Sequence, residues 1–214
     1  MMVVVSIGTE NLEQVRKMAK EALLRGSDLV EFRLDLIWEN PPELRQINEL
    51  LKGFSNKAIL TWRTTSHGGH GSHPTNLWIE RLSFLARYVD IEYDIATKGL
   101  KCRGKRIVSW HDPHGTPEEK YLMDIASNSL SLGDIAKVVT FAKDEIDGYR
   151  VLKLYKKINH ENRLVAFSMG NKASFTRRMA PLLGSPLTYA YLDEPVAEGQ
   201  LSLNEALALK EIVC

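Results

Sequence analysis

The residues of this chain that could do chemistry are charged side chains inside apolar segments. The clearest is Lys137 in "GDIAKVVTF", where Ile135, Val138 and Val139 predict a strand buried on both faces. A buried amine with other cations near it is favoured in its neutral form, which attacks carbonyl carbons. Lys137 is therefore a candidate for forming a protonated imine, a Schiff base that acidifies the neighbouring carbon. The structural alternative is a lysine that extends to the surface along apolar neighbours.

His111, in "SWHD" on the preceding apolar segment, is the natural proton carrier for such a reaction. Imidazole titrates near neutral pH and serves as general acid or base. If the two segments are adjacent strands, they lie about 5 Å apart, which would let Lys137 and His111 act on one molecule. A lone histidine in a strand is more often a hydrogen-bonded core residue, so it is the pair that predicts chemistry.

Four further apolar segments carry charged residues within them or just after them. These residues are Glu31, Arg33, Arg63, Asp90, Glu92 and Arg177. Each has an ordinary explanation when taken alone, such as an internal ion pair between Glu31 and Arg33. Burying all of them would cost several kcal/mol for each unpaired charge, which indicates that the set serves a ligand. Basic groups outnumber acidic ones in the whole set, so a small anionic molecule is the expected partner.

The segments that contain these residues must also position them. Eight short apolar segments alternate with longer amphipathic ones, which is typical of βα units on a parallel sheet. They span residues 2–8, 28–35, 57–63, 88–94, 105–112, 134–141, 163–170 and 186–192. Eight such units close into a (β/α)8 TIM barrel, whose active site lies at the carboxyl ends of the strands. The alternative is an open doubly wound sheet, but "SIGTEN" after the first segment lacks the glycine-rich turn of that fold.

Two helices have clear boundary signals. Thr9 is expected to cap a helix that Gly26 ends, and Ser202 is expected to start the last helix. Residues 95–104 leave little room for a helix. Because no low-complexity tract or linker divides the chain, we expect one (β/α)8 barrel catalytic domain over residues 1–214.

Composition limits which partners and which cellular compartment are expected for the protein. The chain has 214 residues, 44% of them hydrophobic, and a formal net charge of +1. Without a basic excess, neither nucleic acid nor a membrane surface is the expected partner. Cys102 and Cys214 have no paired spacing, so neither a disulfide framework nor a zinc site is expected. No apolar run approaches the roughly 20 residues of a membrane span, and we expect a cytoplasmic protein.

The same segments, in this order, resemble the type I 3-dehydroquinate dehydratases of the shikimate pathway. The matching pieces are "EFRLD", "TWR" with "HGG", "VDIE", "SWHD", "DIAKVV", "SMGNKASFTRR" and "GSPLTYAYLDEPVAEGQLS", which cover nearly the whole chain. That family is a (β/α)8 barrel that converts 3-dehydroquinate to 3-dehydroshikimate through a lysine imine. The resemblance implies that the protein needs no cofactor and no metal. Barrels of this type often pair, which leaves a homodimer open.

By motif position, the resemblance also assigns roles. It implies that Lys137 forms the imine, that His111 transfers protons and that Arg177 binds the substrate carboxylate. The residues expected to hold ring hydroxyls or to close over the substrate are Glu31, Arg33, Arg63 and Gln200. The residues expected to orient the histidine are Asp90 and Glu92.

Four positions depart from the family pattern, among them Glu198 in place of a proline on the last loop and Ala173 in place of a glycine. His67 stands where the family usually has a glutamate that helps to position the catalytic histidine, and Val196 replaces a serine on the last loop. Residues 66–76 and 192–200 are the expected lid loops. The first of them holds three histidines, but the glycines between them favour a flexible polar lid over a metal site.

Two other functions stay open. A Schiff-base (class I) aldolase would use the same lysine, and fold alone does not exclude it. Such an enzyme acting on a sugar phosphate would need a phosphate site after strands seven and eight, whereas Arg177 there resembles a carboxylate clamp. A catalytically inactive ligand-binding barrel would tolerate the loss of Lys137 or His111, and both are present.

Overall fold

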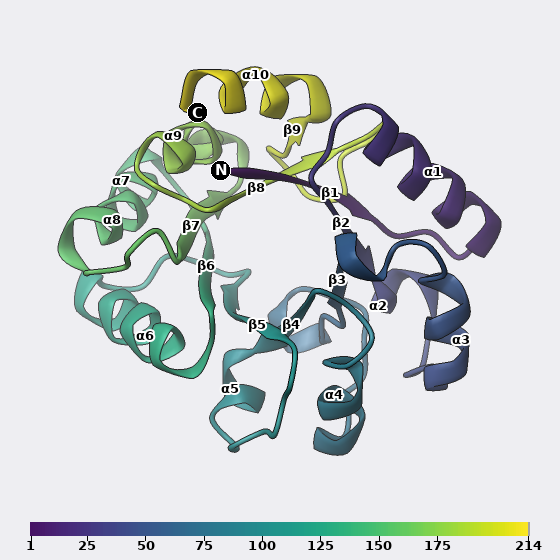
Figure 1. The fold of residues 1–214 in the computed structure, drawn as a ribbon. Helices are drawn as coiled ribbons and strands as arrows, with labels where there is room; N and C mark the ends of the chain where they lie inside the picture. The colour runs from purple at the N-terminus through teal and green to yellow at the C-terminus, as the bar shows by residue number, and fades with distance from the viewer. Residues whose placement is uncertain (214) are drawn as a thin grey trace.

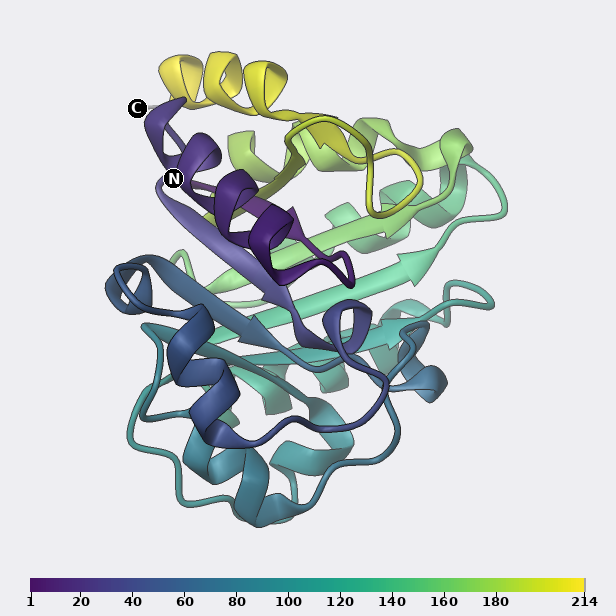
Figure 2. The same cartoon turned by 90° about the vertical axis from the view of Figure 1, so that its right-hand side faces the viewer.

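The strands of this protein form a curled parallel sheet inside a ring of helices (Figure 1), as seen in a computed structural model that describes residues 1–213. The strands are β1 (Met2–Ile7), β2 (Leu29–Arg33), β3 (Ala58–Thr61), β4 (Tyr88–Glu92), β5 (Lys105–Asp112), β6 (Ile135–Phe141), β7 (Leu164–Met169), β8 (Leu187–Tyr191) and β9 (Leu201–Ser202). Strands β1 to β8 each fall inside a predicted segment, so all eight predicted strands are confirmed. Viewed from the side, their arrowheads point the same way (Figure 2), which gathers the carboxyl ends at one mouth.

The sheet order is β7-β6-β5-β4-β3-β2-β1-β8-β9, and every pair of neighbours is parallel. Among residues 1–213 no backbone ladder joins β7 to β8. Side chains close this seam instead, with the rings of Phe167 and Tyr189 6.5 Å apart between centroids. Helix α9 (Phe175–Leu182) packs against both strands from outside. The predicted (β/α)8 barrel is confirmed, with one seam held by side chains.

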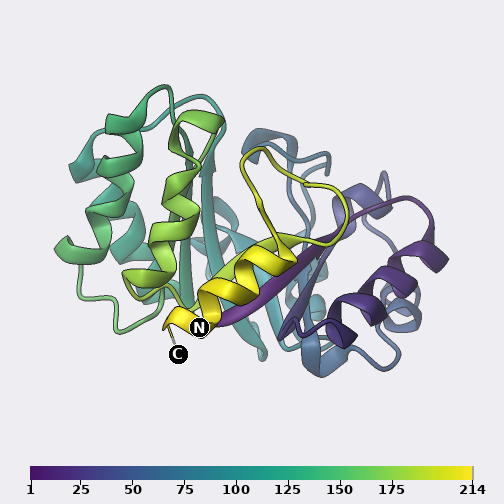
Figure 3. The same cartoon turned by 90° about the horizontal axis from the view of Figure 1, so that it is seen from above.

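The remaining helices cover the outside of the sheet. They are α1 (Leu12–Leu24), α2 (Leu34–Ile37), α3 (Leu44–Leu50), α4 (Asn76–Leu82), α5 (Tyr93–Ala96), α6 (Glu119–Leu132), α7 (Glu145–Leu152), α8 (Leu154–Lys157) and α10 (Leu203–Val213), with short 3-10 turns η1 (Ser55–Lys57), η2 (Thr65–His67) and η3 (Asn171–Ala173). As expected, the region around residues 95–104 holds only the single turn α5. Helix α10 lies along β1 (Figure 3) and the two are in contact.

The helix boundaries follow capping chemistry, with one correction. The side chain of Asn11, not of Thr9, accepts a hydrogen bond from the Gln14 amide at 3.0 Å, so the predicted cap of α1 is wrong by two residues. Gly26 ends α1 with φ +102°, a left-handed conformation that suits glycine. Ser202 caps α10 as predicted, because its hydroxyl accepts from the amide of Glu205.

Along β1 to β6 the barrel interior changes from apolar to polar, whereas along β7 and β8 it becomes aromatic. Its lower layer consists of Val4, Leu29, Ile59, Tyr88, Ile107, Ile135, Val165 and Leu187. Two residues further along the same strands come Ser6, Glu31, Thr61, Asp90, Ser109, Lys137, Phe167 and Tyr189, all of them buried. Side chains at this spacing point to the same face of a strand, so the second layer is an interior polar ring interrupted only at β7 and β8.

Two sequence expectations about the setting can be compared with the described residues. None of the helices within residues 1–213 combines the length and the apolar character that crossing a membrane requires. Cys102 is a free thiol, and Cys214 lies outside the described residues.

Candidate active site

A cavity of about 350 Å³ opens at the carboxyl ends of the strands. The predicted site residues that line it are Lys137, His111, Glu31, Arg33, Arg63, Arg177 and Gln200. The other two, Asp90 and Glu92, lie behind this lining and are each 2% exposed. The fold therefore gathers residues from positions 31 to 200 of the chain around one space.

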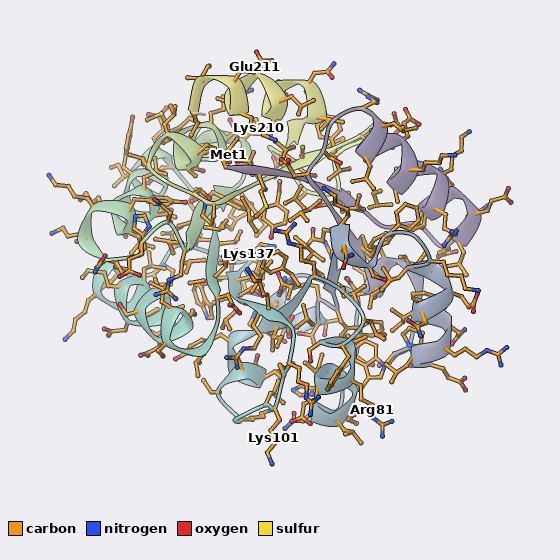
Figure 4. The ribbon with its side chains drawn as sticks, viewed as in Figure 1. Met1, Arg81, Lys101, Lys137, Lys210 and Glu211 are labelled. Atoms are coloured by element: carbon orange, nitrogen blue, oxygen red, sulfur yellow. The ribbon has the colours of Figure 1, made fainter. Side chains whose placement is uncertain are left out.

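Lys137 extends into the barrel from the middle of β6, and acidic groups hold its amine. Figure 4 shows its side chain near the centre of the ring of strands. Its Nζ lies 3.3 Å from Asp90 Oδ2, 3.6 Å from Glu31 Oε1 and 4.1 Å from the centre of the Tyr189 ring. The prediction that cations surround the amine is wrong at short range, because its nearest charged neighbours are carboxylates, which attract an ammonium group.

Asp90 connects Lys137 to Arg63. Arg63 Nη2 donates to Asp90 Oδ1 at 2.8 Å, Nη1 donates to Ser109 Oγ at 2.8 Å, and the Ser109 hydroxyl donates to the same carboxylate. Burial by itself would raise the pKa of Asp90, but the charges of Arg63 and Lys137 and these hydrogen bonds lower it to about 2. The carboxylate therefore stays ionised between two cations.

Glu31 and Arg33 do not form the ion pair that their spacing suggested. Glu31 accepts hydrogen bonds from Ser6 Oγ at 2.6 Å and Thr61 Oγ1 at 2.8 Å, on the side facing Lys137. Arg33 instead binds both carboxylate oxygens of Asp35, at 2.9 and 2.8 Å. This partner lowers the pKa of Asp35 although its burial acts in the opposite direction.

His111 lies on β5 next to Lys137, and the predicted neighbourhood of their two strands is confirmed. The strand register pairs Ser109 with Lys137 and His111 with Val139, so the imidazole stands one layer nearer the mouth than the amine. Burial and the charges of Arg63 and Lys137 hold the pKa of His111 well below its usual value. Its Nδ1 is buried without a hydrogen-bond partner. At neutral pH the ring is therefore a neutral base facing the cavity.

Arg177, in α9, is the cation with the least compensation. It is 6% exposed, its guanidinium lies 4.2 Å above the Phe167 ring, and its Nη2 donates to the Glu198 carbonyl at 3.5 Å. Its Nε has no partner, and no carboxylate within residues 1–213 forms an ion pair with it. Burial accordingly lowers the pKa of Arg177 to about 10. Unused donors on a buried cation that lines a cavity suit an anionic carboxylate.

The last loop, residues 192–200, contributes Val196, Ala197, Glu198 and Gln200 to the cavity wall. Gln200 Oε1 accepts from the Val196 amide at 3.0 Å, which leaves the amide nitrogen of Gln200 for other partners. Val196 offers no hydroxyl, as its departure from the family pattern implied. That this loop and residues 66–76 close as lids stays a prediction.

Glu92 fixes the loop after β3 and does not hydrogen-bond His111. Its two oxygens accept from the backbone amide and the hydroxyl of Thr64, both at 2.8 Å, and it lies 3.5 Å from Arg63. Among the described residues neither Glu92 nor Asp90 hydrogen-bonds His111. Any orienting effect of these carboxylates therefore passes through Arg63, Thr64 or the charge on Lys137.

Within residues 1–213, one group of three metal-ligating side chains comes together: His67, Glu92 and Asp94, whose ligand atoms all lie within 4.8 Å of one another. The other two loop histidines lie outside it. His70 donates its amide hydrogen to Asp35, and the His73 ring contacts the Pro74 carbonyl. The loop histidines themselves therefore do not form a joint site.

Sequence reasoning found the charged members of the interior polar ring but missed its uncharged ones and the neighbouring Tyr189. Ser6, Thr61 and Ser109 orient the charged groups, and Tyr189 carries the face over which the Lys137 amine lies. Burial and the charges of Glu31 and Asp90 raise the pKa of Tyr189. The available signal was the two-residue spacing, because each of these positions follows an inward apolar residue at that distance.

The comparisons with known proteins agree with this geometry. The family model for type I 3-dehydroquinase matches residues 3–212. A 3-dehydroquinate dehydratase of Methanopyrus kandleri is 33% identical, with 99% of this chain and 100% of the relative covered. One from Thermococcus gammatolerans is 35% identical, covering 89% of this chain and 92% of the relative.

Solved structures point the same way. The 3-dehydroquinate dehydratase of Aquifex aeolicus superposes with a TM-score of 0.79 at 28% identity, over 99% of this chain and 98% of that one. The Clostridium difficile enzyme, at 22% identity, shares the fold with a TM-score of 0.84 over 99% of this chain and 91% of its own. With the match spanning almost every residue from β1 to α10, the chain belongs to the type I 3-dehydroquinase family.

Proposed function

We propose that this protein removes water from 3-dehydroquinate to give 3-dehydroshikimate, with Lys137 as the imine-forming residue and His111 as the proton carrier. The observation that carries the proposal is that the amine, a neutral imidazole and the uncompensated guanidinium of Arg177 line one cavity. These three groups match the ketone, the acidic methylene and the carboxylate of that substrate. Family membership supports the same reaction.

In the first step, the Lys137 ammonium passes one proton to the neutral imidazole of His111, and the freed amine adds to the ring ketone to give a carbinolamine. The imidazolium returns that proton to the carbinolamine hydroxyl, which leaves as water, so the imine nitrogen keeps the positive charge. Asp90 and Glu31, 3.3 and 3.6 Å from Nζ, stabilise the positive charge that stays on this nitrogen. Electrostatic stabilisation of the imine is therefore the role that we assign to these two carboxylates.

In the second step, His111 takes a proton from the methylene next to the imine, and the electron pair forms an enamine. The protonated imidazole then returns the proton to the tertiary hydroxyl, which leaves as water. The product at this point is a conjugated imine of Lys137. Water hydrolyses it, which releases 3-dehydroshikimate and restores the amine.

Substrate orientation completes the proposal. Arg177 binds the carboxylate beside the departing hydroxyl and so selects which hydroxyl leaves. The groups proposed to contact the remaining ring oxygens are Glu31, Arg33, Arg63 and Gln200, all of which line the cavity. The alternatives of an aldolase or an inactive barrel are not favoured, because the type I 3-dehydroquinase family model matches residues 3–212 and the similar curated proteins are 3-dehydroquinate dehydratases.

The whole chain, residues 1–214, is proposed as one catalytic domain. We propose a cytoplasmic setting, which fits a sequence whose two cysteines have no paired spacing. A homodimer stays a prediction.

Chemical trapping tests the proposal. Incubation with 3-dehydroquinate and borohydride should reduce the imine to a stable amine, seen as one adduct by intact-mass analysis and mapped to Lys137. Lys137→Ala should give no adduct and no conjugated enone absorbance, whereas Lys105→Ala, an exposed lysine at the start of β5, should behave as the wild type. An adduct on another residue, or enone formation by Lys137→Ala at an undiminished rate, would overturn the mechanism.

A further inference from the structure

A second cluster of chemically capable side chains lies at the barrel mouth, beside the cavity. His67 comes from η2, Glu92 from the end of β4 and Asp94 from α5. The imidazole Nε2 is 3.4 Å from Asp94 Oδ1 and 4.0 Å from Glu92 Oε2. None of these contacts is used by the dehydration proposed above.

Two carboxylates and an unprotonated imidazole nitrogen that face one another repel unless a metal ion or a proton lies between them, and Arg63, 3.5 Å from the other Glu92 oxygen, offsets only part of this charge. The Glu92 side chain is 1% exposed, so water does little to screen it, and two hydrogen bonds from Thr64 fix its orientation. Hydrogen bonds of this kind hold the ligands of metal sites in protein interiors. His67 Nδ1 is buried without a partner, so no hydrogen bond fixes the tautomer, and Nε2 is free to ligate when the proton is on Nδ1.

The donor set selects the kind of cation. One imidazole nitrogen with two carboxylates is a ligand set for Zn²⁺, whereas Mg²⁺ and Ca²⁺ are bound by oxygen. Ligands about 2.0–2.2 Å from a tetrahedral ion lie about 3.4 Å apart. The separation of 3.4 Å between His67 and Asp94 fits this value, and that of 4.0 Å to Glu92 would shorten by a rotation of the His67 ring, because Thr64 fixes the carboxylate. Asp94 is 50% exposed, which gives the ion a path from solvent and leaves the fourth position to water.

We propose that His67, Glu92 and Asp94 form a binding site for a zinc-type divalent ion at the mouth of the barrel. The site is independent of the proposed dehydration, which uses no metal. The competing occupant is a proton on Nε2, which would let the imidazole donate to the carboxylates without any ion. His67 and His111 both line the active-site cavity, so the site adjoins that cavity.

Metal titration distinguishes the two occupants. Chelator-treated full-length protein would be titrated with Zn²⁺ by calorimetry and with Co²⁺ by visible absorption, where a tetrahedral ion gives intense bands. We expect one ion per chain. His67→Ala and Asp94→Asn should each weaken binding by about 100-fold or more. His70→Ala, on the same loop but outside the cluster, should leave the affinity within about twofold.

If His67→Ala fails to fold, Asp94→Asn still tests the site, because the Asp94 side chain is half exposed and its replacement should leave the fold intact. Thermal melts of each metal-free variant check that it is folded. Absence of a binding heat and of the Co²⁺ bands would assign the cluster to a proton and overturn the proposal. Undiminished binding by His67→Ala and Asp94→Asn, or an equal loss in His70→Ala, would overturn it as well.

Discussion

At the scale of single residues, Lys137 and Arg177 differ in how much of their positive charge is balanced by nearby groups. Lys137 has two carboxylates within 3.6 Å, whereas Arg177 has a backbone carbonyl and an aromatic ring. A compensated amine is held in place for reaction, and an uncompensated guanidinium still has its hydrogen bonds to give to a ligand. The two residues therefore differ in task, and their removal should differ in effect.

Arg177→Leu is expected to raise KM for 3-dehydroquinate by about 10- to 100-fold, because a charge-assisted hydrogen bond contributes about 1.5–3 kcal/mol. Steady-state kinetics that separate KM from kcat are the measurement. Arg178→Ala is the matched control, since its exposed side chain pairs with Glu205 on the surface. If KM of Arg177→Leu equalled that of the control, the assignment of the carboxylate to Arg177 would be wrong.

Asp90→Asn is expected to lower the free energy of unfolding by about 3 kcal/mol, because removing one partner leaves buried cations without compensation. Lys137 and Arg63 would then lose the carboxylate that they share. Urea unfolding measures the change. Asp124→Asn, exposed on α6, should shift stability by no more than about 0.5 kcal/mol. Equal stability of the two variants would contradict the shared-carboxylate account.

At the scale of elements, strands were predictable because their signal is local. An apolar β-branched run identifies a strand from its own residues, and the eight runs match β1 to β8. Ion-pair partners depend on where the strand ends: β2 ends at Arg33 and α2 begins at Leu34, so the two-residue alternation breaks there and Arg33 binds Asp35 instead of Glu31. The seam between β7 and β8 could not be predicted from the sequence either, because closure of the barrel depends on the curvature of the whole sheet.

Helix caps are partly predictable from the sequence, less so than strands and more so than ion pairs. Several residues near the start of α1 can serve as caps, and local geometry selects Asn11 over Thr9. Asn11→Ala should therefore lower the free energy of unfolding by about 1 kcal/mol. Thr9→Ala is the paired control, with an expected change of no more than about 0.5 kcal/mol. Urea denaturation of both variants decides, and a larger loss in Thr9→Ala would restore the original cap.

At the scale of the whole molecule, the free energy of unfolding should depend on pH because a buried histidine titrates differently in the folded and unfolded chain. The pKa of His111 is lowered in the folded protein, whereas the unfolded chain titrates near about 6.5. Below that pH the unfolded chain binds a proton that the folded protein does not. Stability contributed by neutral His111 is thus present above about pH 6.5 and is lost as pH falls toward the folded pKa.

The wild type should accordingly lose at most about 1.4 kcal/mol of unfolding free energy per pH unit from this residue between about pH 6.5 and the folded pKa. His111→Asn, which cannot titrate, should show a flatter dependence over the same range. Chemical denaturation at several pH values gives both curves, with His114→Asn, exposed at position 114, as control. Parallel curves for the wild type and His111→Asn would contradict a lowered pKa.

The seam between β7 and β8 affects the distance between Arg177 and Lys137. Elsewhere around the barrel, backbone hydrogen bonds fix neighbouring strands about 4.8 Å apart. At the seam that distance depends on the Phe167 and Tyr189 rings, over which Arg177 and Lys137 respectively lie. The span between guanidinium and amine therefore scales with ring packing. If Arg177 holds the substrate carboxylate and Lys137 the ketone, as proposed, volume changes at Phe167 or Tyr189 should alter the length of the molecule that can span the two.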